Sequence, residues 1–220
     1  MNEKDLKSLY NNRFKDPQKV QKKSMWSILC NNFFSQYVNS SDIVLDLAAG
    51  YCDFINNIQC GEKYAVDLNE DVKKFANNNV NIFLESSTNM KSIKENAIDV
   101  VFVSNFFEHL SSKEALFQTL SEIKRVLKKN GKLLILQPNI RFVYREYWDF
   151  IDHLLPISDR SLVEALEISG FFVKKMIPQF LPYTTKSRLP QAGFLIKIYL
   201  KFPLAWRILG KQCFAVAVKK

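Results

Sequence analysis

The sequence contains little glycine and proline, six and seven residues among 220, and these few residues interrupt it only sparsely. It has no low-complexity tract, internal repeat or Gly/Ser-rich linker, so nothing marks a boundary between domains. With 47% hydrophobic residues, a chain of this length can bury one sizeable core. We therefore expect a single domain over residues 1–220.

An apolar leader and paired cysteines are also missing. The stretch MNEKDLKSLYNNRFKDPQKVQKK is polar where a secretory signal needs an apolar centre. The four cysteines (Cys30, Cys52, Cys60, Cys213) have irregular spacings that fit neither a disulfide framework nor a zinc site. We expect a cytoplasmic protein with reduced thiols and without a bound metal.

Acidic residues are absent from residues 168–220, which carry ten Lys and Arg. Residues 1–41 carry seven basic against three acidic residues, and residues 42–167 carry 14 against 19. A basic tail on an acidic centre suggests an anionic partner, either a phosphorylated metabolite, a nucleic acid or a lipid surface. The alternative is that these cations only provide solubility. Within the tail, residues 188–209 are apolar, but cations and a proline interrupt them too often for a membrane span.

Short apolar runs alternate with helical patterns along the chain, as in βαβ units. Five runs are predicted to be strands: 43–47, 64–66, 80–84, 98–103 and 132–136. Continuous apolar strands are typical of parallel sheets that helices cover on both faces. The pattern therefore predicts a doubly wound α/β sheet.

The clearest helix is predicted over SSKEALFQTLSEIKRVLKKNG, residues 111–131. Ser111 and Glu114 have capping-box spacing, Lys128 and Lys129 occupy the last turn, and Gly131 follows the end. Its apolar stripe consists of Leu116, Leu120, Ile123 and Leu127. After an aromatic, charged segment without clear periodicity, a helix is expected over 159–169 and strands over 171–177 and 213–218.

The loop after the first strand, in VLDLAAGYCDF, has the small residues that a closely bound ligand requires. Gly50 can adopt a positive φ, and Ala48 leaves the backbone accessible. Cys52 argues against a dinucleotide, because a pyrophosphate needs bare backbone at each contact. Asp67 ends the second strand and suits the two hydroxyls of a ribose. S-adenosylmethionine fits, because it has a ribose and no diphosphate.

The ordered set VLDLAAGYCDF, YAVDLNED, NIFLESSTNM, IDVVFVSNFFEHL and EIKRVLKKNGKLLILQPN resembles the class I S-adenosylmethionine-dependent methyltransferases over about residues 40–140. The resemblance implies a Rossmann-like, mostly parallel seven-stranded sheet with helices on both faces and an antiparallel last strand. We divide the chain accordingly into N-terminal helices (1–40), a cofactor-binding core (41–138), an acceptor-site insert and helix (139–170), and C-terminal strands with a basic amphipathic segment (171–220).

By position in the family motifs, several residues are expected to bind the cofactor. The methionine half would contact Asp46, Ala48 and Gly50. Asp67 would bind the ribose, with Leu68 beside it. Ser87 and Thr88 would lie near the adenine, and Ser104 and Asn105 at the edge of the cofactor. The chain departs from the family where Ala48 and Cys52 replace glycines and where Ser87 replaces an acid, which puts the affinity in question.

A hydroxyl acceptor must lose its proton, so a base that titrates near neutral pH is expected. His109 and His153 are the two histidines of the chain and are the candidates, although a structural role is the commoner one. Glu108 could orient a base or bind a cation. Aromatic and acidic residues after the fifth strand would bind the acceptor or merely cover the sheet edge: Tyr144, Tyr147, Trp148 and Asp149. Tyr10 and Arg13 could form a lid over the cofactor or belong to a solvated helix.

The chain lacks the Asn/Asp-Pro-Pro-aromatic and Pro-Cys motifs of nucleic-acid base methylation, so a nucleic-acid substrate is not favoured. The whole-chain pattern, including FLPYTTKSRLPQAGFLIKIYLKFPLAWRILGKQCFAVAVK, also resembles small methyltransferases of bacterial surface-polysaccharide and glycolipid synthesis. The hypothesis is therefore O-methylation of a sugar or another small polar acceptor. Phosphorylated sugars and lipid-linked sugars are among the candidate acceptors. The basic tail would contact the inner membrane face peripherally. The alternatives are an RNA methyltransferase and a non-catalytic module that binds the cofactor.

Overall fold

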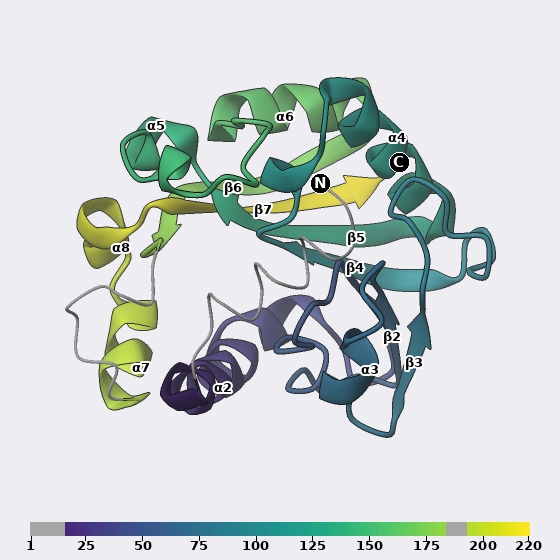
Figure 1. Ribbon diagram of the computed structural model, residues 1–220, viewed down its shortest axis with the longest axis horizontal. Helices are drawn as coiled ribbons and strands as arrows, with labels where there is room; N and C mark the ends of the chain where they lie inside the picture. Colours follow the sequence, from purple (N-terminus) through teal and green to yellow (C-terminus); the bar gives the residue numbers. More distant parts are fainter. Residues whose placement is uncertain (1–15, 184–192) are drawn as a thin grey trace.

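A seven-stranded sheet forms the centre of the computed structural model, which describes residues 16–183 and 193–220 (Figure 1). The strand order is β3-β2-β1-β4-β5-β7-β6. The strands are β1 (Ile43–Leu47), β2 (Glu62–Val66), β3 (Val80–Phe83), β4 (Ile98–Ser104), β5 (Leu127–Pro138), β6 (Phe171–Leu181) and β7 (Gln212–Lys219). In this sheet β7 pairs antiparallel with both β5 and β6, and the other pairings are parallel. The predicted fold class is confirmed.

Helices cover both faces of this sheet (Figure 1). The α-helices are α2 (Asp16–Asn32), α3 (Val72–Phe75), α4 (Lys113–Val126), α5 (Ile140–Val143), α6 (Asp159–Ile168), α7 (Gly193–Lys201) and α8 (Pro203–Leu209). Three short 3-10 helices are η1 (Phe34–Tyr37), η2 (Phe107–His109) and η3 (Tyr147–Asp149). Helices α4 and α6 lie on one face, and α2 and α7 lie on the other.

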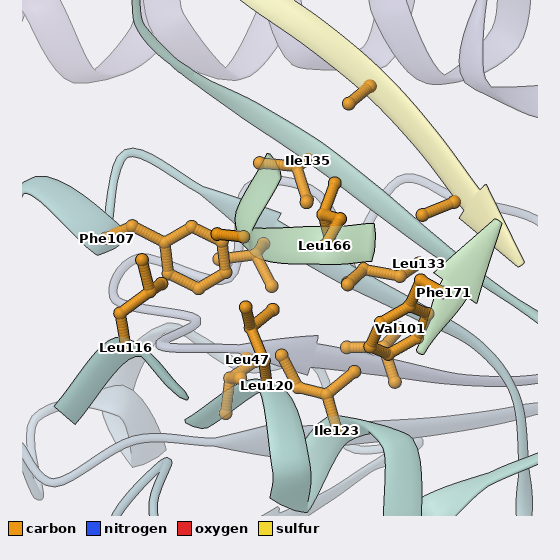
Figure 2. Packing of buried hydrophobic residues seen from close by; sticks show 14 of the residues in the cluster. Leu47, Val101, Phe107, Leu116, Leu120, Ile123, Leu133, Ile135, Leu166 and Phe171 are labelled. Carbon is orange, nitrogen blue, oxygen red and sulfur yellow. The ribbon is translucent and has the colours of Figure 1, made fainter. Parts of the chain in front are cut away.

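Two apolar clusters, one on each face, hold the layers together. In the first, Leu120 of α4 and Leu166 of α6 pack over strand residues such as Val101 (Figure 2). In the second, aromatic rings dominate: Phe34 lies 5.2 Å from Phe102, measured between ring centroids. Because both faces of the central strands are buried, these strands consist almost entirely of apolar residues.

The predicted end of the helix over 111–131 was wrong. Helix α4 ends at Val126, and Leu127 is already extended and pairs with Ile98. Lys128 does not occupy a helical turn: its Nζ lies 2.9 and 2.8 Å from the two carboxylate oxygens of Asp99. Asn130 has a φ of 63°, a conformation that asparagine tolerates better than most residues. These tertiary contacts override the helical propensity of the Lys-Lys pair.

The segment between β1 and β2 also differs from the expected helix. Residues 51–58 form successive turns, in which Cys52 N donates to Ala49 O at 2.7 Å and Ile58 N donates to Phe54 O at 3.0 Å. Cys52 has a φ of 57°, which no residue inside a right-handed helix adopts. The left-handed residue therefore prevents a regular helix from starting here.

Tyr10 and Arg13 lie outside the described residues, so the proposed lid stays a prediction. Residues 188–209 were expected to be too interrupted for a membrane span. Within 16–183 and 193–220, the structure contains no helix with the length and apolarity needed to cross a bilayer.

The N-cap of α4 is Ser112, one residue after the predicted Ser111. The Ser112 side chain accepts a hydrogen bond from the Ala115 N–H at 3.2 Å. Ser111 is exposed and belongs to the preceding loop. The capping role therefore belongs to the second serine of the pair.

We predict that Ser112→Ala lowers the free energy of unfolding by about 1 kcal/mol, because the Ala115 N–H loses its acceptor. In a protein of this size, that loss corresponds to about 2–4 °C in Tm. Ser111→Ala is the matched control and should change stability by less than about 0.5 kcal/mol. Thermal melts of the two variants distinguish the caps, and a larger loss for Ser111→Ala would contradict the assignment.

Candidate active site

The loop between β1 and β2 combines three left-handed residues at the carboxyl end of the central strands. Ala48, Gly50 and Cys52 have φ values of 55°, 52° and 57°. For a residue with a Cβ this conformation costs roughly 1–2 kcal/mol. The alternation turns the backbone sharply at the place where parallel α/β sheets bind ligands. Ala48 and Cys52, which replace family glycines, both still adopt the glycine-like conformation.

Asp67 links this loop to the turn after β2. Its Oδ2 accepts from the Gly50 N–H at 2.8 Å, and its Oδ1 accepts from the Asn69 N–H at 2.7 Å. Burial raises the pKa of Asp67, and the backbone donors partly offset this rise. Because each carboxylate oxygen has a second lone pair, both can still accept a hydroxyl hydrogen.

The surroundings of Gly50 and Asp67 fit an adenosyl cofactor. A Cβ added at Gly50 would meet no atom within 4 Å, so the backbone there is open to a ligand. Leu68, next to Asp67, exposes 68% of its surface and is therefore accessible to a ligand. An exposed apolar side chain beside hydroxyl-binding oxygens matches a nucleoside.

Asp46 is buried beneath the same loop, with 3% of its surface exposed. Its Oδ2 accepts from the Ile55 N–H at 3.3 Å, which holds the turns that follow β1. Burial raises the pKa of Asp46 well above its usual 3.8 despite this donor, and the charges of Asp53 and Asp67 raise it further. Asp46 therefore shapes the loop from below.

The remaining cofactor candidates lie on two other loops. After β3, Ser87 is buried and its hydroxyl lies 2.9 Å from that of Thr119 in α4, while the Thr88 and Ser86 hydroxyls are 2.9 Å apart. After β4, Ser104 Oγ accepts from Asn105 Nδ2 at 3.1 Å, and Asn105 has a φ of 48°. Ser87 thus ties its loop to α4, whereas Asn105 is exposed.

The two histidines, 44 positions apart in the sequence, come together at the end of β4. The ring centroids of His109 and His153 are 5.0 Å apart. The His109 Nδ1 lies 3.0 Å from the carbonyl oxygen and 3.2 Å from a carboxylate oxygen of Asp152. Because Nδ1 faces two oxygen acceptors, we assign it a proton, so that in the neutral ring the lone pair is on Nε2.

Glu108 completes this cluster and is 3% exposed. Its Oε2 has no hydrogen-bond partner, and its backbone carbonyl accepts from both the Leu154 and Leu155 N–H groups, at 2.8 and 3.0 Å. Burial raises the pKa of Glu108 to about 7, although the neighbouring His109 lowers it. Burial by itself would lower the pKa of His109, but the bond to Asp152 and the charge of Glu108 outweigh it and raise that pKa.

The predicted acceptor residues divide into buried and exposed ones. Tyr147 is fully buried, donates its hydroxyl to Leu155 O at 2.7 Å and packs its ring 4.6 Å from that of His153. Tyr144, Trp148 and Asp149 are exposed on the same segment. Tyr147 therefore supports the histidine, and the other three are accessible to an acceptor.

Sequence reasoning missed two polar neighbours of the histidines. Asp152 bonds His109, and the hydroxyl of Tyr183 lies 3.5 Å from Nδ1 of His153. An acid directly before His153 was a usable signal for Asp152. No local pattern could have indicated Tyr183, which lies two residues after the end of β6.

The sheet order and the loops after β1, β2 and β4 agree with the methyltransferase-like fold that the sequence resemblance predicts. A family comparison agrees: residues 45–135 match the family described as "Methyltransferase domain". Residues 45–135 are thus similar to a methyltransferase domain, and solved methyltransferase structures share the fold of the chain.

One curated relative is the ubiquinone/menaquinone biosynthesis C-methyltransferase UbiE of Blochmanniella pennsylvanica, 29% identical over 169 residues. The match covers 69% of this chain and spans 65% of the relative. Among solved structures, a SAM-dependent methyltransferase from Archaeoglobus fulgidus has a TM-score of 0.66 at 24% identity, covering 96% of this chain and 98% of that one. A geranyl diphosphate C-methyltransferase from Streptomyces coelicolor has a TM-score of 0.61 at 14% identity, covering 86% and 77%.

We predict that Asp46→Asn reduces the loss of stability on going from acid to neutral pH. Because folding raises the pKa of this carboxyl, the folded state binds more protons than the unfolded state above pH 3.8, and stability falls as pH rises. A tenfold difference in proton affinity is worth about 1.4 kcal/mol. Asparagine can still accept from the Ile55 N–H without a charge.

Urea unfolding of the cofactor-free protein at pH 8 and pH 5 measures this effect. Asp46→Asn should be more stable than wild type at pH 8, and its advantage should shrink at pH 5. Asp149→Asn changes an exposed aspartate and should show no such difference. If Asp46→Asn is less stable than wild type at pH 8, the buried charge of Asp46 is not the cause of the loss of stability with rising pH.

Proposed function

We propose that this protein transfers the methyl group of S-adenosylmethionine to a hydroxyl of a sugar or another small polar acceptor. The observation that carries this proposal is the cluster of Glu108, His109 and His153. Strand β4, which leads into the cluster, is the direct neighbour of β1, which leads into the cofactor loop. The proposal therefore places proton-removing chemistry next to the methyl donor.

Asp67, the loop from Ala48 to Gly50 and Leu68 would hold the cofactor. The free lone pairs of Asp67 are suited to the two ribose hydroxyls, and Gly50 to close approach of the methionine half. Because Asp67 is already anchored by two backbone donors, its carboxylate loses little freedom when a ligand binds.

The cofactor supplies an electrophilic methyl group, which the acceptor takes in a direct displacement while the C–S electron pair remains on sulfur. The acceptor hydroxyl must then lose its proton. His109 directs its Nε2 lone pair away from Asp152, and Asp152 fixes the orientation of the ring. Exposed Tyr144 and Trp148 provide flat apolar surfaces for a ring-shaped acceptor.

Methylation of a carbon is the second candidate, because the 29% identical relative is named a C-methyltransferase. A deprotonated hydroxyl on an aromatic ring shares its charge with a neighbouring ring carbon, so either its oxygen or that carbon can take the methyl group; the carbon then loses its proton to restore the aromatic ring. The same cluster would serve both reactions. A role in surface-polysaccharide synthesis stays a prediction. The methyl-transfer assay distinguishes the two alternatives, an RNA methyltransferase and a non-catalytic module.

We predict that His109→Gln lowers kcat for methyl transfer by about 10²- to 10⁴-fold while the Kd for S-adenosylmethionine stays within about twofold. The assay follows a ¹³C-labelled methyl group into sugars, phenols and RNA, and the chemical shift of the product separates O-methyl from C-methyl. Lys113→Gln, an exposed change, is the control. Cofactor binding without turnover across the panel would favour the non-catalytic module, and methylated RNA would favour the RNA enzyme.

Helices α7 and α8 carry large apolar side chains that face solvent. Phe194, Phe202 and Ile208 expose 63%, 61% and 80% of their surfaces. The opposite side of the same helices packs into the second apolar cluster through Leu200 and Trp206. The helices are thus apolar on both sides, which is unusual for helices that face only water.

The exposed side also carries positive charge without negative charge. Lys197, Lys201 and Arg207 are exposed, and residues 193–209 contain no Asp or Glu. Exposed apolar side chains and cations on one surface are suited to a membrane with anionic lipids, because the apolar groups insert between headgroups and the cations are attracted to them. We propose that this surface, called here the α7–α8 surface, docks on anionic lipids.

The α7–α8 surface lies at the same end of the sheet as the candidate active site. In Figure 1, α5, α7 and α8 gather at the end from which β7 starts, and because β7 is antiparallel to β5, this is the carboxyl end of the parallel strands. Lys211, directly after α8, forms an ion pair with Glu146 of the acceptor segment. Docking would therefore bring the acceptor site to the lipid surface, which supports a lipid-linked acceptor.

We predict that the protein sediments with vesicles containing phosphatidylglycerol and that sedimentation weakens as salt rises. Changing Lys197, Lys201 and Arg207 to Gln should weaken partitioning roughly hundredfold, at about 1 kcal/mol per cation. The matched control changes Lys94, Lys129 and Lys220 to Gln, three exposed cations at the opposite end of the sheet. Equal losses in the two triple variants would indicate nonspecific charge attraction and overturn the docking surface.

A further inference from the structure

Glu108, His109 and His153 each place one potential ligand atom close to those of the other two. These atoms all lie within 4.8 Å of one another. We propose that this cluster binds one divalent transition-metal ion, of the Zn²⁺ or Mn²⁺ class. This inference deepens the proposed function, on which its catalytic part rests, and it replaces the expectation of a protein without a metal.

The donor set favours this class of ion. Two imidazoles and one carboxylate form a common set for catalytic zinc and for other divalent transition metals, and such sites leave further positions open. Two ligand atoms at about 2.0–2.2 Å from one ion can be at most about 4.4 Å apart. The separations within the cluster, all within 4.8 Å, are close to this limit.

The carboxylate of Glu108 provides an independent observation. This side chain is 3% exposed, and its Oε2 has no hydrogen-bond partner. A buried polar atom without a partner is rare and costs free energy, because water no longer solvates it. A cation would satisfy this oxygen and compensate for its burial.

The contacts around the cluster match the outer shell of a metal site. A metal-ligating histidine usually donates its other ring N–H to a carboxylate or a carbonyl. His109 does this with Asp152, whose carbonyl and carboxylate oxygens lie 3.0 and 3.2 Å from Nδ1. The Glu108 carbonyl binds the Leu154 and Leu155 N–H groups, so the backbone on either side of the cluster is held in place.

If the proposed function holds, the ion would act on the acceptor. A divalent cation next to a hydroxyl lowers the pKa of that hydroxyl and so favours transfer of its proton to solvent before methyl transfer. His109 would then act as a ligand, and the positive charge of the ion would replace proton acceptance by imidazole. Acceptors that offer two neighbouring oxygens would be preferred, because they can occupy two open positions.

Metal binding is measured on tag-free protein that has been stripped with EDTA. Isothermal titration with Zn²⁺ and optical titration with Co²⁺ should both give one ion per chain, and Co²⁺ should show visible d–d absorption without a thiolate charge-transfer band. Glu108→Gln and His153→Gln should each weaken the Kd by more than about tenfold, and Asp152→Asn by about 10- to 100-fold. Glu167→Gln, an exposed glutamate, should bind like wild type.

Circular dichroism melts establish that each variant is folded at the titration temperature. If one of the two ligand variants does not fold, the other still tests the site. Three results would overturn the site: no one-to-one binding, a wild-type Kd in both Glu108→Gln and His153→Gln, or a thiolate charge-transfer band. Binding needs neither methyl donor nor acceptor, so it can succeed when methyl transfer fails. If both hold, EDTA should reduce turnover of wild type to the level of Glu108→Gln.

Discussion

The parallel arrangement of β1, β2, β4 and β5 is the constraint from which the functional part of this protein follows. Parallel strands end at the same edge, so residues that immediately follow different strands meet there regardless of their distance in sequence. Asp67 follows β2 and reaches the backbone of Gly50, which follows β1. His109 follows β4 by a few residues and meets the segment after β5. The cofactor loop and the histidine cluster are thus two results of one topology.

The parts of the fold that the sequence predicted are those whose cause is local. The strands are buried on both faces, so runs such as residues 98–104 are almost purely apolar and easy to locate. Gly50 and Asp67 could be assigned to the ligand edge because strand ends follow from those runs. The end of α4 could not be predicted in this way, because it depends on a tertiary contact, the ion pair between Lys128 and Asp99.

The candidate site was predictable as a set of residues but not as an arrangement. His109 and His153 were each identified from residue type, whereas their contact depends on a fold of residues 139–158 that has no periodic pattern. The amides of Leu154 and Leu155 bind the Glu108 carbonyl, a long-range contact that local propensity does not encode. The burial of Glu108, which leaves its Oε2 without a hydrogen-bond partner, also depends on long-range contacts and could not be predicted from the residues around it.

The position of β7 between β5 and β6 affects how the chain can acquire its structure. Residues 212–219 are translated after β6, yet they supply the hydrogen-bond partners of both neighbours. Until they emerge from the ribosome, the edge of β5 remains open and β6 has no strand to join, so the nascent chain presents unpaired edges. The earlier strands can assemble during synthesis, and closure of the sheet waits for the last strand. A chain that has been made only as far as residue 211 therefore carries an open strand edge at β5, where it can pair with other chains.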